Sequence, residues 1–130
     1  MLTMTALTKS LHADPLAEFL DAGGVEIVST FGEPQLEYSA IRKGCGLACF
    51  PQRGLLEVTG TDRHAFLGNL LTNKTYDAAA KQGMRAGEGR HAYFLNLKGR
   101  VVAEMNLIER GERLWIETEA RLVPVLRDTF

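Results

Sequence analysis

The sequence is poor in cysteine and lacks any long apolar run. Its 130 residues include two cysteines, too few for a disulfide framework. No hydrophobic stretch approaches the length that a membrane-spanning helix needs. No cationic segment followed by an apolar one, the pattern of a secretory leader, precedes Asp14. We therefore expect a soluble protein without membrane contact, located in the cytoplasm or in an organelle matrix.

The sequence also lacks an excess of charge of either sign. Fifteen lysines and arginines stand against sixteen aspartates and glutamates, so the net charge is -1. This balance gives no electrostatic signal for direct nucleic-acid binding. The hydrophobic share of 45% and the charged share of 24% are close to globular averages. A chain of this length can bury a core as one domain without help from disulfides or metal.

Metal-ligand spacing is absent as well. The three histidines are His12, His64 and His91. They are too scattered to form a ligand pair, and His64 is expected on the solvent face of its helix. Cys45 and Cys49 fall two ligands short of an iron–sulfur cluster, and Gly46 interrupts any helix between them. We expect no metal site, and we expect both thiols to be buried or half-buried structural groups.

The first third of the chain has a weak pattern. Residues 1–13 show no sustained period and are expected to form a flexible arm ahead of a domain over residues 14–130. Asp14 followed by proline is typical of a helix start, and the glycine pair 23–24 of a helix end, so a helix is expected between them. A short strand and a second helix are expected at Val25–Val28 and Leu36–Lys43.

The remaining residues predict a sheet with helices. Strands are expected at Arg53–Thr59, His91–Asn96, Val101–Ile108 and Arg113–Thr118, the last three as a meander. Thr61 is the predicted N-cap of a helix that carries Phe66, Leu67, Leu70 and Leu71. The interleaving has no regular βαβ period. It therefore predicts an α+β fold, a mostly antiparallel sheet with helices packed on it.

The order of several motifs resembles one family. The motifs are Pro15-Leu16, Gly23-Gly24, Tyr38, Arg42, Gly46-Leu47, RGLLEVTGTDRHAFLGNLLTN and NLKGRVVAE. Over residues 14–127 they resemble the N-terminal portion of the folate-binding domain of the glycine-cleavage T-protein and the YgfZ-type iron–sulfur proteins. Leu122, Val123 and Leu126 begin an apolar helical face just before the last residue. We therefore expect a domain truncated at its C-terminus, and a dimer through the face that the missing part would cover.

The resemblance implies tetrahydrofolate or another reduced folate as the cofactor. In the aminomethyltransferase branch, an aspartate in the segment matching NLKGRVVAE takes part in the reaction. Ala103 holds that position here, and Glu104 lies on the other side of the strand. The Lys98-Gly99-Arg100 turn is similar instead to the YgfZ branch, whose members serve iron–sulfur enzyme assembly or repair.

Three functions follow as expectations. The first is a tetrahydrofolate-binding YgfZ-like protein that supports iron–sulfur proteins or tRNA modification, with or without turnover of its own. The second is an aminomethyltransferase, a transferase that moves a one-carbon unit to tetrahydrofolate. The third is an interaction module that has lost folate binding.

Five residues are candidates for the folate site. They are Tyr93, Lys98, Arg100, Glu104 and Glu119. Tyr93 would stack on the pterin ring, and Lys98 and Arg100 would hold the glutamate tail. Glu119, where the family carries an asparagine, would accept hydrogen bonds from pterin nitrogens, and Glu104 is the candidate for proton transfer. The alternative for Lys98, Arg100 and Glu104 is a solvated surface role, and for Tyr93 a place in the core or a cross-strand pair.

Overall fold

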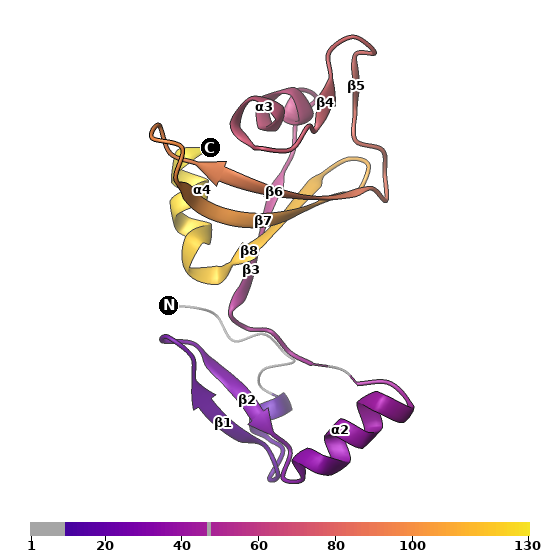
Figure 1. Cartoon of the computed structure of the whole chain (residues 1–130), viewed down its shortest axis with the longest axis vertical. Coiled ribbons are helices and arrows are strands. Elements are labelled where there is room, and N and C mark those ends of the chain that lie inside the picture. Colours follow the sequence, from indigo (N-terminus) through magenta and orange to yellow (C-terminus); the bar gives the residue numbers. More distant parts are fainter. Residues whose placement is uncertain (1–9, 47) are drawn as a thin grey trace. The chain divides into compact units, whose positions relative to one another are not determined.

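A computed structural model describes residues 10–46 and 48–130. The chain divides into two compact units, Met1–Gln52 and Arg53–Phe130 (Figure 1). Residues 1–9 of the predicted arm, and Leu47 of the Gly46-Leu47 motif, lie outside the described residues. The predicted α+β class is confirmed, because antiparallel strands are combined with short helices. No helix in the described part of the chain is long and apolar enough to cross a membrane.

The first unit contains a β-hairpin and one helix. Its elements are β1 (Glu18–Asp21), β2 (Glu26–Thr30) and α2 (Pro34–Lys43). Glu37 of α2 accepts hydrogen bonds at 2.7 Å from the Thr30 hydroxyl and from the Phe31 backbone, which ties the start of the helix to the end of β2. The predicted strand near Val25–Val28 and the helix over Leu36–Lys43 are confirmed. None of the described residues in this unit is buried.

The predicted helix after Asp14 is wrong, because its residues form turns and β1. The Asp14 carboxylate accepts a hydrogen bond from the Leu16 backbone at 2.9 Å, and the Asp21 carboxylate accepts one from Gly24 at 3.0 Å. Gly23 and Gly24 have φ values of 68° and 84° and turn the chain from β1 into β2. Aspartate and glycine serve turns as readily as helix ends, and here the turn prevails.

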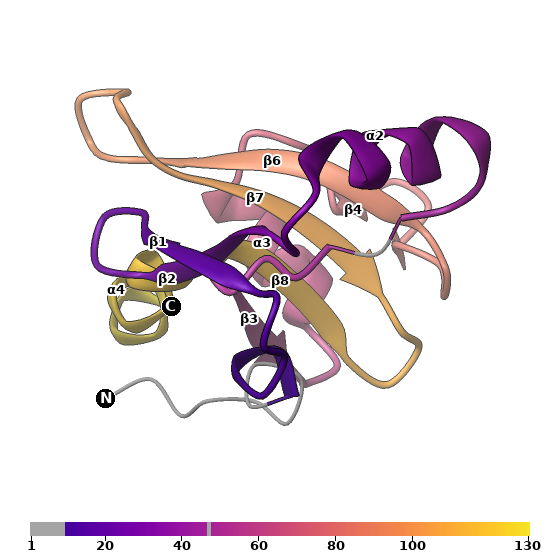
Figure 2. The same cartoon turned by 90° about the horizontal axis from the view of Figure 1, so that it is seen from below.

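The second unit is organised around a four-stranded antiparallel sheet. Its strands are β3 (Arg53–Val58), β6 (Gly89–Leu95), β7 (Val101–Glu109) and β8 (Leu114–Glu119), in the order β3-β8-β7-β6. The four predicted strands are confirmed. The β6–β7 turn and the β7–β8 turn lie at opposite ends of this sheet (Figure 2). A two-stranded hairpin that the sequence did not predict, β4 (Tyr76–Asp77) and β5 (Gln82–Gly83), connects to β6.

One face of the sheet carries the hydrophobic core. Alternate residues of β7 and β8 form its centre: Ala103, Met105, Leu107, Leu114 and Ile116. Leu67 of α3 (Arg63–Leu70) and Leu126 of α4 (Val123–Thr129) pack into the same cluster and are 0% exposed. Burying a leucine side chain contributes about 2 kcal/mol. Both helices therefore cover this face, and the predicted C-terminal helix is confirmed; a 3-10 turn, η1 (Ala120–Leu122), precedes α4.

The predicted N-cap at Thr61 is wrong by one residue, since α3 begins at Arg63. Asp62 holds the N-cap position without a side-chain hydrogen bond to the helix. Arg63 organises this junction instead: Nη1 donates to the Gly60 carbonyl at 2.8 Å, and Nη2 donates to the Gly111 carbonyl at 2.6 Å. A guanidinium reaches two loops at once, which a threonine cap cannot do.

Candidate functional site

The sheet face opposite the core, called the outer face below, brings together three of the five predicted folate residues. Tyr93 of β6 lies directly across from Glu104 of β7. On the next strand, the Thr118 hydroxyl donates to the Glu104 carbonyl at 2.7 Å, and Glu119 follows Thr118 with its side chain on the outer face. Tyr93, Glu104 and Glu119 thus lie across neighbouring strands, toward the end with the β6–β7 turn.

An aromatic group and a carboxylate meet at the centre of this arrangement. Tyr93 is 38% exposed, and its ring lies edge-to-face against the His91 ring, with 4.9 Å between the centroids. His91 Nε2 lies 3.0 Å from Glu104 Oε1. The second Glu104 oxygen has no hydrogen-bond partner among residues 10–46 and 48–130. One oxygen of an exposed carboxylate therefore remains available beside an accessible aromatic ring.

Charged neighbours extend the outer face across β8 and β3. Arg53 donates two N–H groups to Glu117, and Asn106 donates a third hydrogen bond to the same carboxylate at 2.8 Å. These bonds, the one from Arg53 above all, hold the pKa of Glu117 below its usual value. The ion pair with Arg121 lowers the pKa of Glu119 in the same way. Both carboxylates remain acceptors at neutral pH.

The other two predicted folate residues lie beyond the end of the outer face. Lys98 and Arg100 flank Gly99, which has a φ of 73°, in the β6–β7 turn. The Asn96 side chain accepts hydrogen bonds from the backbone of Lys98 at 2.9 Å and of Arg100 at 3.0 Å. The turn is therefore well defined, while both cationic side chains are exposed and have no ion-pair partner among the described residues.

Ala103 and Glu104 lie on opposite faces of β7. Ala103 is 1% exposed within the core, whereas the Glu104 side chain is 60% exposed on the outer face. A side chain at position 103 therefore points toward α3 and α4, away from Tyr93. Glu104 cannot substitute for a carboxylate at position 103 without a change in strand register.

His64 is not on a solvent face, so that prediction is wrong. It is buried, and its Nε2 lies 2.6 Å from Glu109 Oε2; Arg63 Nη2 lies 3.0 Å from the other Glu109 oxygen. Burial lowers the pKa of His64, the Arg63 charge lowers it further, and Glu109 opposes both effects. The sequence contained a signal for one member of this cluster, Glu109, which strand alternation places on the apolar face of β7 together with Leu107.

The His64 ring also packs tightly against β5. A β-carbon added to Gly83 would lie 1.7 Å from His64 Nδ1, which is far closer than atoms can approach. Gly83 is therefore required for space and not for an unusual backbone angle. Two-residue strands such as β4 and β5 have no readable periodicity, so the sequence could not indicate this contact.

Neither cysteine takes part in a metal-binding cluster of the described chain. Cys45 is exposed, contrary to the expectation of a buried or half-buried thiol, and Cys49 is half-buried; both are free thiols. Within residues 10–46 and 48–130, no group of three or more His, Cys, Asp or Glu side chains is arranged to hold a metal ion.

Similarity to known proteins points in the same direction as the motif order. The chain is 29% identical over 93 residues to the aminomethyltransferases of Bacillus cytotoxicus and Bacillus mycoides, matches that cover 72% of this chain and 24% of each relative. It is 28% identical over 97 residues to the aminomethyltransferase of Bacillus subtilis, which covers 75% of this chain and 25% of the relative. No family model matches the chain.

The fold and these relatives together define the class: an α+β segment similar to part of the aminomethyltransferases. The chain spans about a quarter of the length of the curated relatives it matches. These matches support a distant similarity to the glycine-cleavage T-protein superfamily.

Proposed function

We propose that this chain supplies one wall of a reduced-folate site in a YgfZ-like protein that supports iron–sulfur enzymes or tRNA modification. The observation that carries the proposal is the direct cross-strand pairing of Tyr93 and Glu104 on the outer face. A pterin offers a flat ring with N–H donors along one edge. An accessible aromatic ring and a carboxylate with one available oxygen match those two properties.

The remaining candidate residues fit the same ligand. Glu119 is a second ionised acceptor two strands away from Tyr93, and Lys98 and Arg100 extend from the β6–β7 turn beyond that end of the face. A folate carries a carboxylate tail at the far end from the pterin. The turn cations would bind that tail while the strand residues hold the ring.

An aminomethyltransferase is the second candidate, because the curated relatives carry that name. Ala103 argues against it. The position that matches the family's aspartate holds a methyl group inside the core, 1% exposed, so it cannot polarise a ligand on the outer face. Folate binding without aminomethyl transfer is therefore the function that we favour.

The test is calorimetric titration of the intact gene product with tetrahydrofolate. We expect micromolar binding, about -8 kcal/mol. Tyr93→Ala and Glu104→Gln should each weaken it by about tenfold, since each removes a direct contact. The matched control is Arg127→Gln, which changes an exposed residue of α4. The absence of binding by the intact protein would favour an interaction module without folate, and measured aminomethyl transfer would favour the second candidate.

A further inference from the structure

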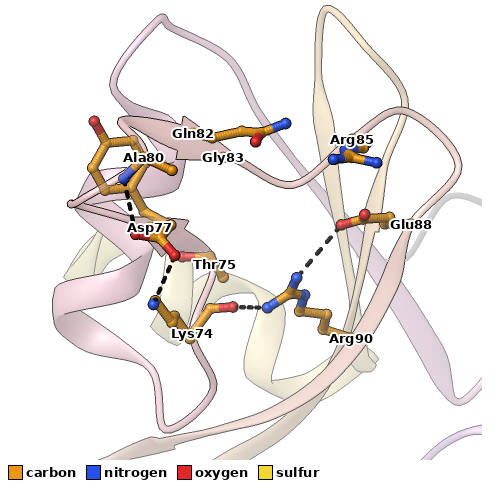
Figure 3. Close-up of a pocket in the computed structure, with 10 residues that line it drawn as sticks. Lys74, Thr75, Asp77, Ala80, Gln82, Gly83, Arg85, Glu88 and Arg90 are labelled. Carbon is orange, nitrogen blue, oxygen red and sulfur yellow. Dashed lines mark hydrogen bonds and ion pairs between the residues drawn. The ribbon is translucent and has the colours of Figure 1, made fainter.

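A polar cavity in the second unit is lined by none of the residues of the proposed folate face. It has a volume of about 360 Å³ and is formed by the β4–β5 hairpin and the segment that leads into β6 (Figure 3). That volume is in the range of small-molecule pockets. Most of the side chains around it are polar or charged, so a charged or strongly polar group suits it better than an apolar one.

Three cations and two carboxylates line this cavity. The cations are Lys74, Arg85 and Arg90, and the carboxylates are Asp77 and Glu88. The local balance is one positive charge, in a chain whose net charge is -1. The cavity is therefore a local positive site that the overall composition conceals.

Two of the three cations are held in place by neighbours. Lys74 Nζ lies 3.2 Å from Asp77 Oδ2, and Arg90 lies 3.5 Å from Glu88 and also donates to the Lys74 carbonyl. The backbone N–H groups of Ala79 and Ala80 donate to Asp77 at 2.9 and 3.1 Å. These bonds, the one from Ala80 first, lower the pKa of Asp77, so it remains ionised beside Lys74.

Arg85 differs from the other two cations. It lies across the cavity from Lys74 (Figure 3) and has no hydrogen-bond or ion-pair partner for its side chain among the described residues. A guanidinium has five N–H donors in a planar fork that matches an oxyanion. The surroundings of Arg85 thus leave that fork free to bind a ligand in the cavity.

We propose that this cavity binds a compact oxyanion, a phosphate or carboxylate group of a small molecule, with Arg85 as its main ligand. Arg90 and Lys74 add positive charge on the opposite wall, and their own partners hold them in position. The site shares no residue with the outer face, so it is independent of the proposed folate function.

Titration of the isotope-labelled chain by nuclear magnetic resonance tests the proposal, with inorganic phosphate and glutarate as probes and chloride at equal ionic strength as the blank. We expect saturable shifts of the Thr75, Gln82 and Gly83 backbone amides with at least one probe. Arg85→Gln should weaken that binding by about tenfold, which is the effect of losing one charge-assisted contact. The probe that binds more tightly identifies whether the ligand carries phosphate or carboxylate.

Arg127→Gln is the control, because it removes the same charge from an exposed residue of α4. It should bind both probes as the unchanged chain does. The proposal is overturned if neither probe shifts these amides beyond the chloride blank, or if the two variants lose affinity equally. Thermal unfolding of both variants verifies that they are folded, since Arg85 is exposed and its replacement should leave the core intact.

Discussion

His64 Nε2 lies 2.6 Å from Glu109 Oε2; both residues are buried, and Arg63 contacts the other Glu109 oxygen. The three residues connect the start of α3 to the end of β7. We expect this buried cluster to stabilise the second unit, and separate variants of His64 and Glu109 measure what each residue contributes.

Stability should fall as the pH drops below about 6.5. The pKa of His64 is lowered from 6.5 in the folded chain, so the unfolded chain takes up a proton at pH values where the folded chain does not. The loss therefore begins near 6.5 and levels off below the folded-state pKa. Urea unfolding between about pH 8 and about pH 5 measures it.

His64→Gln should flatten this part of the profile. The control His91→Gln changes an exposed histidine of the outer face and should retain the slope that His64 causes. An unchanged slope in His64→Gln would show that another group titrates.

Glu109→Gln should destabilise the chain by about 3 kcal/mol. It removes the negative charge that compensates Arg63 and that faces the His64 ring in a buried setting, and breaking such a pair is costly. Glu57→Gln is the matched control, since Glu57 pairs with Arg113 at the surface and should contribute less than about 1 kcal/mol. Equal losses in urea unfolding would contradict a special role for the buried cluster.

The sequence predicted the large sheet correctly because each of its strands is long enough to show alternation. Leu56 and Val58 share one face, and the apolar residues of β7 repeat every second position. The His64–Glu109 contact was missed because its partners are 45 residues apart and no local pattern encodes their meeting. The helix predicted after Asp14 failed for a different reason: a short stretch with aspartate and glycine at both ends satisfies a helix and a hairpin equally well.

For the candidate folate residues too, local patterns predicted some features of their placement and missed others. Strand alternation correctly separated Ala103 from Glu104. It could not show that Tyr93 lies opposite Glu104, because cross-strand register depends on the turn geometry around Asn96. Nor could it indicate the cavity around Arg85, which depends on two-residue strands.

Leu126→Ala should destabilise the chain by about 3 kcal/mol. Leu126 is 0% exposed and packs into the core, so its truncation leaves a cavity. Leu97→Ala, at a fully exposed turn position, should change stability by less than about 0.5 kcal/mol. Similar values for both variants in urea unfolding would mean that α4 does not pack against the sheet.

Ala103→Asp should lower stability by about 2 kcal/mol or more and should not create aminomethyl transfer. It would bury a carboxylate in the core, on the opposite side of β7 from Tyr93. Val101→Asp, on the same strand but 60% exposed, should be nearly neutral. Urea unfolding and a transfer assay of the intact gene product measure both effects, and a stable, active Ala103→Asp variant would refute this assignment of faces.

The close approach of Gly83 to the His64 ring predicts that the residues at these two positions depend on each other. There is no room for even a methyl group at position 83 while the His64 ring keeps its present position, so a relative that keeps this histidine arrangement is expected to keep the glycine. A relative with a larger residue at position 83 is expected to carry a smaller one at position 64. The residues at positions 64 and 83 should therefore covary among related sequences.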